Sequence, residues 1–76
     1  SLKNTTEGYD ASTPQVNMTF EYSTGAVYQG QMRGGFRDGK GIMTWADGAK
    51  YNGEWKMGYA SGTGTFTHVD GDVYEG

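Results

Sequence analysis

Few residues of this chain could do chemistry, and every familiar pattern that they form is incomplete. The run Gly34–Lys40 nearly matches the Gly-x-x-x-x-Gly-Lys loop that binds phosphate, but Gly41 follows where a Ser or Thr would hold magnesium. No helix is indicated after it either. Asp70-Gly71-Asp72 offers acidic oxygens, yet it lacks the length and ligand spacing of a calcium-binding EF-hand loop. We interpret both stretches as turns and expect neither a nucleotide nor a metal ion.

His68 is the only histidine, and the chain has no cysteine. Pairs of nucleophile and base, and metal sites built on several histidines, therefore cannot be assembled from these residues. Pairs of carboxylates remain, but Glu54 and Glu75 fall on the side of their strands that we assign to solvent. We expect His68 to be a packed ring, and we expect no catalytic residue, no cofactor and no enzymatic activity within these residues.

Composition limits the class of protein. The chain has 76 residues, of which 14 are glycine, and 34% of all residues are hydrophobic. This length and composition favour one small domain without a thick layered core. Its net charge is −3, and it lacks the strongly basic surface of a nucleic-acid-binding protein. No run of about 18 apolar residues would span a bilayer, and no signal-peptide pattern opens the chain. The absence of cysteine favours a reducing compartment, so we expect a location on the cytoplasmic side.

A tyrosine-centred phrase recurs every 23 residues. Tyr28-Gln29-Gly30 returns as Tyr51-Asn52-Gly53 and as Tyr74-Glu75-Gly76. Turn residues recur with the same period: Gly35 with Gly58, Gly39 with Gly62, Gly41 with Gly64, and Asp47-Gly48 with Asp70-Gly71. Self-similarity at this period indicates a repeat architecture in which each unit buries its apolar face against the next.

Short β-prone runs alternate with glycine signals from Asn17 onward, and no stretch has the apolar spacing of a helix. The sequence therefore predicts an all-β ribbon of consecutive antiparallel hairpins without a helix. The expected strand pairs are about 18–22 with 26–32, 41–45 with 49–55, and 64–68 with 72–75, joined by links at 33–40 and 56–63. Residues 1–16 are polar and predict an extended or disordered lead-in. Residues 17–76 form the repeats, in units of about 17–40, 41–63 and an incomplete 64–76.

Two loop lengths fit the tip of the second hairpin, and they place the aromatic rings differently. A two-residue loop at Asp47-Gly48 would set Tyr51 opposite Thr44 and scatter the rings over both faces. A three-residue loop with a left-handed Gly48 sets Tyr51 opposite Met43 and gathers them. We expect the longer loop, because a one-residue slip moves side chains to the wrong face. One face then holds Gly41, Met43, Trp45, Tyr51, Gly53 and Trp55, and the other holds Ile42, Thr44, Lys50, Asn52 and Glu54.

The pattern Tyr51-x-Gly53-x-Trp55-x-x-Gly58-x-x-x-Gly62-x-Gly64, followed by Asp70-Gly71-x-x-Tyr74-x-Gly76, resembles the MORN (membrane occupation and recognition nexus) repeat. The resemblance covers residues 18–76. It is imperfect at two positions: Met32 occupies the repeat position that Trp55 occupies in the next unit, and His68 occupies the position that Trp45 occupies in the unit before. It implies a curved ribbon of hairpins that does not itself catalyse. Similar repeats occur in scaffolds of cilia, flagella, apicomplexan cytoskeletons and membrane junctions. They also occur as accessory arrays of plant lipid kinases and of a lysine methyltransferase.

From the resemblance and the clustering of rings we expect a scaffold or protein-interaction module, a subunit or fragment of a larger cytoskeletal, ciliary or membrane-associated assembly. Partners would bind an aromatic groove or the unpaired strand edges, which also permit self-association. The expected anchors in the groove are Tyr28, Trp45, Tyr51, Trp55 and Tyr74. The alternative role for these rings is simply to hold the ribbon together.

Two other functions stay open at this point. Four basic residues in the predicted links, Arg33, Arg37, Lys40 and Lys56, could contact the headgroups of anionic lipids such as phosphoinositides. The array could also be the targeting segment of a larger lipid kinase or methyltransferase.

Overall fold

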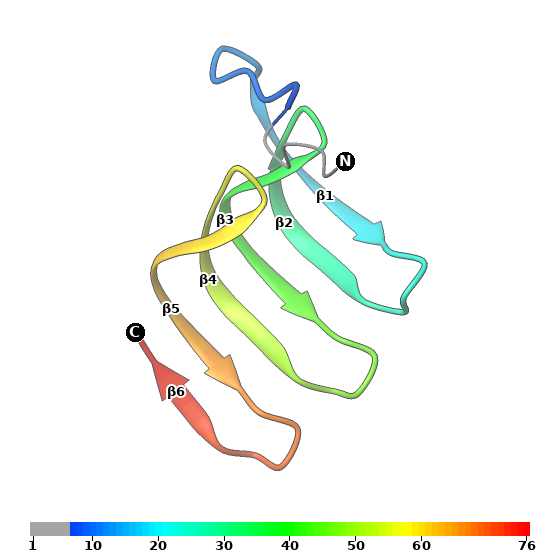
Figure 1. Cartoon of the computed structure of the whole chain (residues 1–76), viewed down its shortest axis with the longest axis vertical. Helices are drawn as coiled ribbons and strands as arrows, with labels where there is room; N and C mark the ends of the chain where they lie inside the picture. The colour runs from blue at the N-terminus through cyan, green and yellow to red at the C-terminus, as the bar shows by residue number, and fades with distance from the viewer. Residues whose placement is uncertain (1–6) are drawn as a thin grey trace.

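The computed structural model describes residues 7–76, which form one six-stranded antiparallel sheet in chain order (Figure 1). Its strands are β1 (Gln15–Glu21), β2 (Val27–Arg33), β3 (Phe36–Thr44), β4 (Lys50–Lys56), β5 (Tyr59–Thr67) and β6 (Val73–Glu75). No helix occurs between residues 7 and 76, so the predicted all-β ribbon of hairpins is confirmed. Residues 1–6 of the predicted lead-in lie outside the described residues, and β1 already begins at Gln15.

The hairpin loops at residues 23–25, 46–48 and 69–71 have the predicted register. Tyr51 lies opposite Met43 and Thr44 opposite Lys50, while the Trp45 amide donates to the carbonyl of Ala49 at 2.8 Å. Gly48 has a φ of 98°, which is the left-handed conformation that the three-residue loop requires. Phe20 lies opposite Tyr28 and Phe66 opposite Tyr74 in the same way. The rings therefore gather on one face, here called the aromatic face, and the opposite side is called the polar face.

The predicted links at 33–40 and 56–63 are wrong, because most of these residues are strand. Arg33 lies opposite Phe36 and Lys56 opposite Tyr59, which leaves two-residue returns at 34–35 and 57–58. Both residues of each return have positive φ, 57° and 90° in the first return and 51° and 90° in the second. This is the type I′ turn, whose twist matches that of the flanking strands. The sequence did not predict strands at 36–40 and 59–63, because these segments and the returns before them are rich in glycine.

A bulge bends the sheet midway along each repeat. The register shifts between Gly30 and Met32 in the β2–β3 pair and between Gly53 and Glu54 in the β4–β5 pair. A side-chain oxygen then accepts a hydrogen bond from the bulged strand: Gln31 Oε1 accepts from the Lys40 amide at 2.8 Å. Glu54 accepts from the Thr63 hydroxyl at 2.7 Å, and this bond holds the pKa of Glu54 below its ordinary value. The bends curve the sheet visibly (Figure 1).

Tyrosine rings lie directly over glycines of the next strand. An ideal Cβ built on Gly41 would fall 2.1 Å from the Tyr28 hydroxyl, and one on Gly64 would fall 2.1 Å from the Tyr51 hydroxyl. Tyr28 is fully buried and donates to the Gln31 carbonyl at 2.6 Å. Burial raises the pKa of Tyr28 to about 12, so the phenol stays protonated and keeps donating.

Trp55 completes this core between the two tyrosines. Its ring meets Tyr28 edge to face at 5.6 Å and Tyr51 edge to face at 5.2 Å, a geometry that aromatic pairs favour. Its indole N–H donates to the Gly41 carbonyl at 3.1 Å. The buried hydrophobic cluster consists of Ala26, Tyr28, Met32, Met43 and Trp55, with Tyr22 and Tyr51 packed against it.

Replacing Gly41 with alanine should lower the free energy of unfolding by about 3 kcal/mol, because the added methyl group would overlap the buried Tyr28 ring. Urea denaturation followed by circular dichroism measures the change. Lys40→Ala is the matched control at the neighbouring exposed position and should change stability by less than about 0.5 kcal/mol. Equal stability of the two variants would contradict the placement of the ring.

Candidate functional site

An aromatic groove lies on the aromatic face, across β3, β4 and β5. It encloses about 320 Å³. Trp45 and Phe66 form its outer wall, with ring centroids 5.7 Å apart, and Tyr51 lies beside them. Because the protein is one sheet thick among residues 7–76, no second layer covers these rings. The groove is lined by Arg37, Met43, Trp45, Tyr51, Trp55, Gly58, Tyr59, Ala60 and Phe66.

Arg37 brings a positive charge into this groove. Its guanidinium lies 5.0 Å from the Trp55 ring and 5.5 Å from the Tyr22 ring, as a cation–π contact with each. Nε and Nη2 donate to the Gly58 carbonyl at 3.1 and 2.5 Å, and Nη1 reaches the Tyr22 hydroxyl at 3.5 Å. A guanidinium has five N–H donors, so donors remain for an incoming acceptor. Sequence reasoning missed this role, because the equivalent residue of the next repeat is Ala60.

The five predicted anchor residues lie at different depths. Trp45 is 36% exposed and Tyr74 is 58% exposed, whereas Tyr51 is half-buried. Trp55 is 7% exposed and forms the floor of the groove. Tyr28 is fully buried, so a partner cannot contact its ring in this arrangement. Tyr74 lies outside the groove and lines a neighbouring hollow of about 310 Å³ together with Tyr51 and Phe66.

The four predicted lipid-contact residues do not form one cationic surface. Arg33 donates to Asp38 at 3.4 Å and to the carbonyls of Ala11 and Thr13, and Arg37 lies in the groove. Lys40 and Lys56 are exposed, and Lys40 lies opposite the acidic Glu54 in the β3–β4 ladder. The two arginines are therefore engaged by oxygens of the protein itself.

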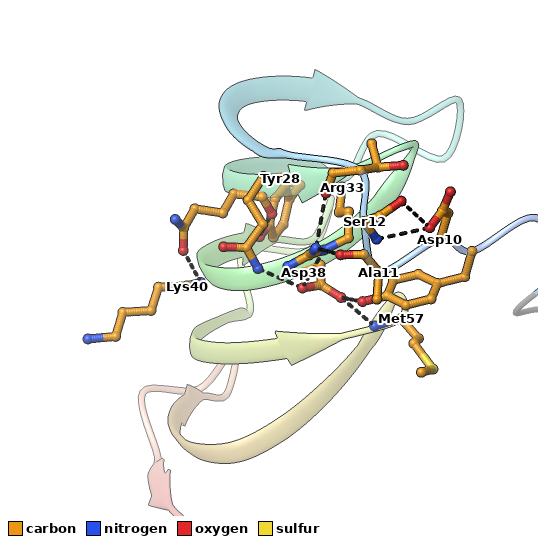
Figure 2. Close-up of polar contacts among 12 residues, drawn as sticks. Asp10, Ala11, Ser12, Tyr28, Arg33, Asp38, Lys40 and Met57 are labelled. Carbon is orange, nitrogen blue, oxygen red and sulfur yellow. Dashed lines mark hydrogen bonds and ion pairs between the residues drawn. The ribbon is translucent and has the colours of Figure 1, made fainter.

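Asp38, in β3, is the one buried charged residue among residues 7–76, and it joins the segment before β1 to β3 and to the second return (Figure 2). Its carboxylate accepts from the Tyr9 hydroxyl and from Gln15 Nε2, both at 2.7 Å. It also accepts from the Met57 amide at 3.2 Å, in the return where Met57 adopts its left-handed φ. The Tyr9 ring packs edge to face on Phe36 at 5.4 Å. Sequence periodicity does not predict this cluster, because the repeat equivalent of Asp38 is Ser61.

Hydrogen bonding outweighs burial at Asp38. Burial alone would raise the pKa of this carboxyl, but bonds from Tyr9, Gln15 and the Met57 amide, with the Arg33 charge, hold its pKa below the ordinary value. The bond to Asp38 raises the pKa of Tyr9 in turn. The cluster is therefore a carboxylate held in its charged form by four donors, and we assign these four hydrogen bonds a structural role.

The other motifs singled out in the sequence lie in turns and strands. Gly34 and Gly35 form the first return, and Asp70-Gly71-Asp72 forms a hairpin loop in which Asp70 accepts from the Asp72 amide at 3.0 Å. His68 is half exposed and lies 3.4 Å from Asp70. Within residues 7–76, no three His, Cys, Asp or Glu side chains are grouped as metal ligands. No helix in this part of the chain has the length and apolar character to cross a membrane.

Comparison with known families agrees with this geometry. The MORN repeat model matches residues 28–50 and 51–73, two consecutive repeats that each begin at a core tyrosine. These matches cover more than half of the chain, so the protein belongs to the MORN repeat family. MORN repeats occur in scaffold and membrane-binding proteins, generally mediate interactions with proteins or membranes, and are generally not catalytic. No curated protein matches the chain.

Replacing Asp38 with asparagine should lower the free energy of unfolding by about 1–3 kcal/mol at pH 7, because the donors around this buried side chain lose a charged acceptor. The pKa of Asp38 is lower in the folded than in the unfolded chain. The stabilisation of the fold by the Asp38 carboxylate is therefore complete above the unfolded pKa of about 3.9, and it is lost as the pH falls through the folded pKa.

Thermal unfolding of wild type and variant between neutral and strongly acidic pH measures this difference, which should shrink in acid. Ser61→Ala, at the exposed equivalent position of the next repeat, should leave stability unchanged. A difference that persists undiminished in acid would rule out a stabilising carboxylate at position 38.

Proposed function

We propose that this protein is a non-catalytic interaction module of a scaffold, and that it binds a segment of a partner protein in the aromatic groove. The observation that carries this proposal is the wall formed by Trp45 and Phe66, on a sheet that no second layer covers among residues 7–76. Exposed clusters of large rings are rare on surfaces that bind nothing. Tyr51 and Trp55 give the groove its side and floor, and both are fixed by edge-to-face packing.

The chemistry of the groove favours an apolar segment that carries a carboxylate. Aromatic residues and arginine supply most of the binding energy in protein interfaces. Trp45 and Phe66 would contact apolar side chains, while the remaining N–H groups of Arg37 would donate to a carboxylate in a site already partly desolvated. Because the rings and the guanidinium are held by their own contacts, little ordering is needed on binding, and that favours affinity.

The wider setting that we propose is a larger cytoskeletal, ciliary or membrane-associated assembly on the cytoplasmic side. Support comes from the occurrence of MORN repeats in scaffold and membrane-binding proteins. A place in the targeting array of a longer lipid kinase or methyltransferase would use the same groove.

Attachment to anionic lipid is the weaker proposal. Two of its four cations, Arg33 and Arg37, donate to oxygens of the protein itself. The remaining pair would give only weak adsorption, at about 1 kcal/mol for each basic residue near an anionic surface.

Panning a displayed library of random dodecapeptides against the wild-type protein tests the groove. Counter-selection against Trp45→Ala should leave peptides rich in apolar residues with an acidic residue among them. Their affinity should fall at least tenfold in Trp45→Ala or Phe66→Ala, as expected for aromatic anchors. Thr44→Ala, on the polar face next to Trp45, is the matched control and should bind like wild type.

Two outcomes would contradict the proposal. One is that counter-selection against Trp45→Ala, with its fold intact by circular dichroism, leaves no peptide that binds the wild-type protein. The other is strong flotation with phosphoinositide vesicles that is lost in Lys40→Ala/Lys56→Ala and unaffected by Trp45→Ala, which would favour the lipid function.

A further inference from the structure

β1 is an open edge strand with unusual features for an edge. Proteins usually protect such edges with lysine, a bulge or a covering segment. β1 contains no lysine, and its ladder with β2 runs from Gln15 to Glu21 without a shift. The preceding segment turns away from this edge, since Tyr9 packs on Phe36 and Arg33 holds the Thr13 carbonyl. Among residues 7–76, no strand pairs with the outer side of β1.

The backbone groups that face outward follow from the hairpin register. The Tyr22 amide donates to the Ala26 carbonyl, so these two residues form a hydrogen-bonded pair. Hydrogen-bonded and non-bonded pairs alternate in an antiparallel ladder. The even-numbered residues of β1 therefore bond to β2, and the odd-numbered residues direct their N–H and C=O groups outward. These residues are Gln15, Asn17, Thr19 and Glu21.

An apolar stripe runs along the same strand on the aromatic face. Val16 is 54% exposed, and Met18 and Phe20 are each 42% exposed. They lie opposite Met32, Gly30 and Tyr28 of β2, so the stripe continues the buried core out to the edge. A strand added beside β1 would cover these side chains as well as the open backbone groups.

We propose that β1 pairs antiparallel with β1 of a second copy of this chain, with Met18 opposite Met18 at the two-fold axis. In this register Asn17 meets Thr19 of the partner and Gln15 meets Glu21 of the partner. All four outward residues then fall in hydrogen-bonded pairs, which gives about eight bonds between the copies. Val16 meets Phe20 of the partner on the aromatic face. A register shifted by one residue would place the outward N–H and C=O groups of one copy opposite residues of the other copy that already bond to their own β2. It would also put the apolar side chains of the two copies on opposite faces of the sheet.

Charge favours a second copy as the occupant. Glu21 is the only charged residue of β1, and in this register it faces the neutral Gln15. The pairing is therefore self-complementary with no like charges opposed, as a two-fold interface requires. The result is a continuous sheet of twelve strands whose two aromatic grooves open on the same side. The pairing uses no residue of the groove, so it does not depend on the proposed function.

Paired charge variants test both the dimer and its register. Asn17 and Thr19 are exposed and lie opposite the neutral Gln31 and Gln29 of their own β2. Asn17→Lys/Thr19→Lys places lysine against lysine across the axis and should weaken the dimer about tenfold. Asn17→Lys/Thr19→Glu places lysine against glutamate and should restore or strengthen it. In registers that pair Asn17 or Thr19 with itself, the second variant would be weakened too.

Sedimentation equilibrium between roughly 10 µM and 1 mM protein at low salt measures the dimer. Wild type should show a reversible monomer–dimer equilibrium. Asn17→Lys/Thr19→Glu should dimerise at least as tightly as wild type, and Asn17→Lys/Thr19→Lys should dimerise less tightly than wild type. Thermal melts confirm that the variants fold, and Trp45→Ala should dimerise like wild type. A wild type that stays monomeric at 1 mM, or a dimer equally strong in both charge variants, would overturn the proposal.

Discussion

The contact between a tyrosine ring and a glycine of the next strand is the constraint on which the rest of this structure depends. A protein with one sheet has no second layer to bury its apolar residues, so the core must form by bending the sheet around its own side chains. Tyr28 over Gly41 and Tyr51 over Gly64 make this bend compact, because no Cβ keeps the ring away from the backbone. The bulge beside each glycine supplies the curvature, and Trp55 fills the space between the two rings.

The repeats share this frame but differ in the residues that are added to it. Asp38 and Arg37 belong to one repeat, while the next has Ser61 and Ala60 at the same positions. Asp38 joins the segment before β1 to β3 and to the second return, and Arg37 is held between two rings at the groove. The shared frame thus leaves the aromatic groove and the β1 edge as separate surfaces. A scaffold needs two such surfaces if it is to bind a partner and assemble at the same time.

Much of the frame follows from sequence periodicity, and most of the particular contacts do not. The 23-residue period and the face segregation of the rings predict the family, the loop length and the pairing of Tyr51 with Met43. The strand residues 36–40 were missed because bulge and turn glycines interrupt any β-pattern there. Arg37 and Asp38 were not identified as structural groups, because each depends on distant partners in the fold, Tyr22 and Trp55 for one and Tyr9 for the other. Exposure also separates Trp45 from Tyr28, which repeat position alone cannot do.

Nuclear magnetic resonance tests the ring–glycine contact most directly. The Hα resonances of Gly41 and Gly64 should shift well upfield under the currents of the Tyr28 and Tyr51 rings, and each should show strong nuclear Overhauser contacts to the ring protons above it. Gly48, which has no side chain over it, should resonate near its ordinary position. Ordinary Hα shifts at Gly41 and Gly64, with no contacts to the tyrosine rings in the folded protein, would contradict this account of the fold and of the groove built on it.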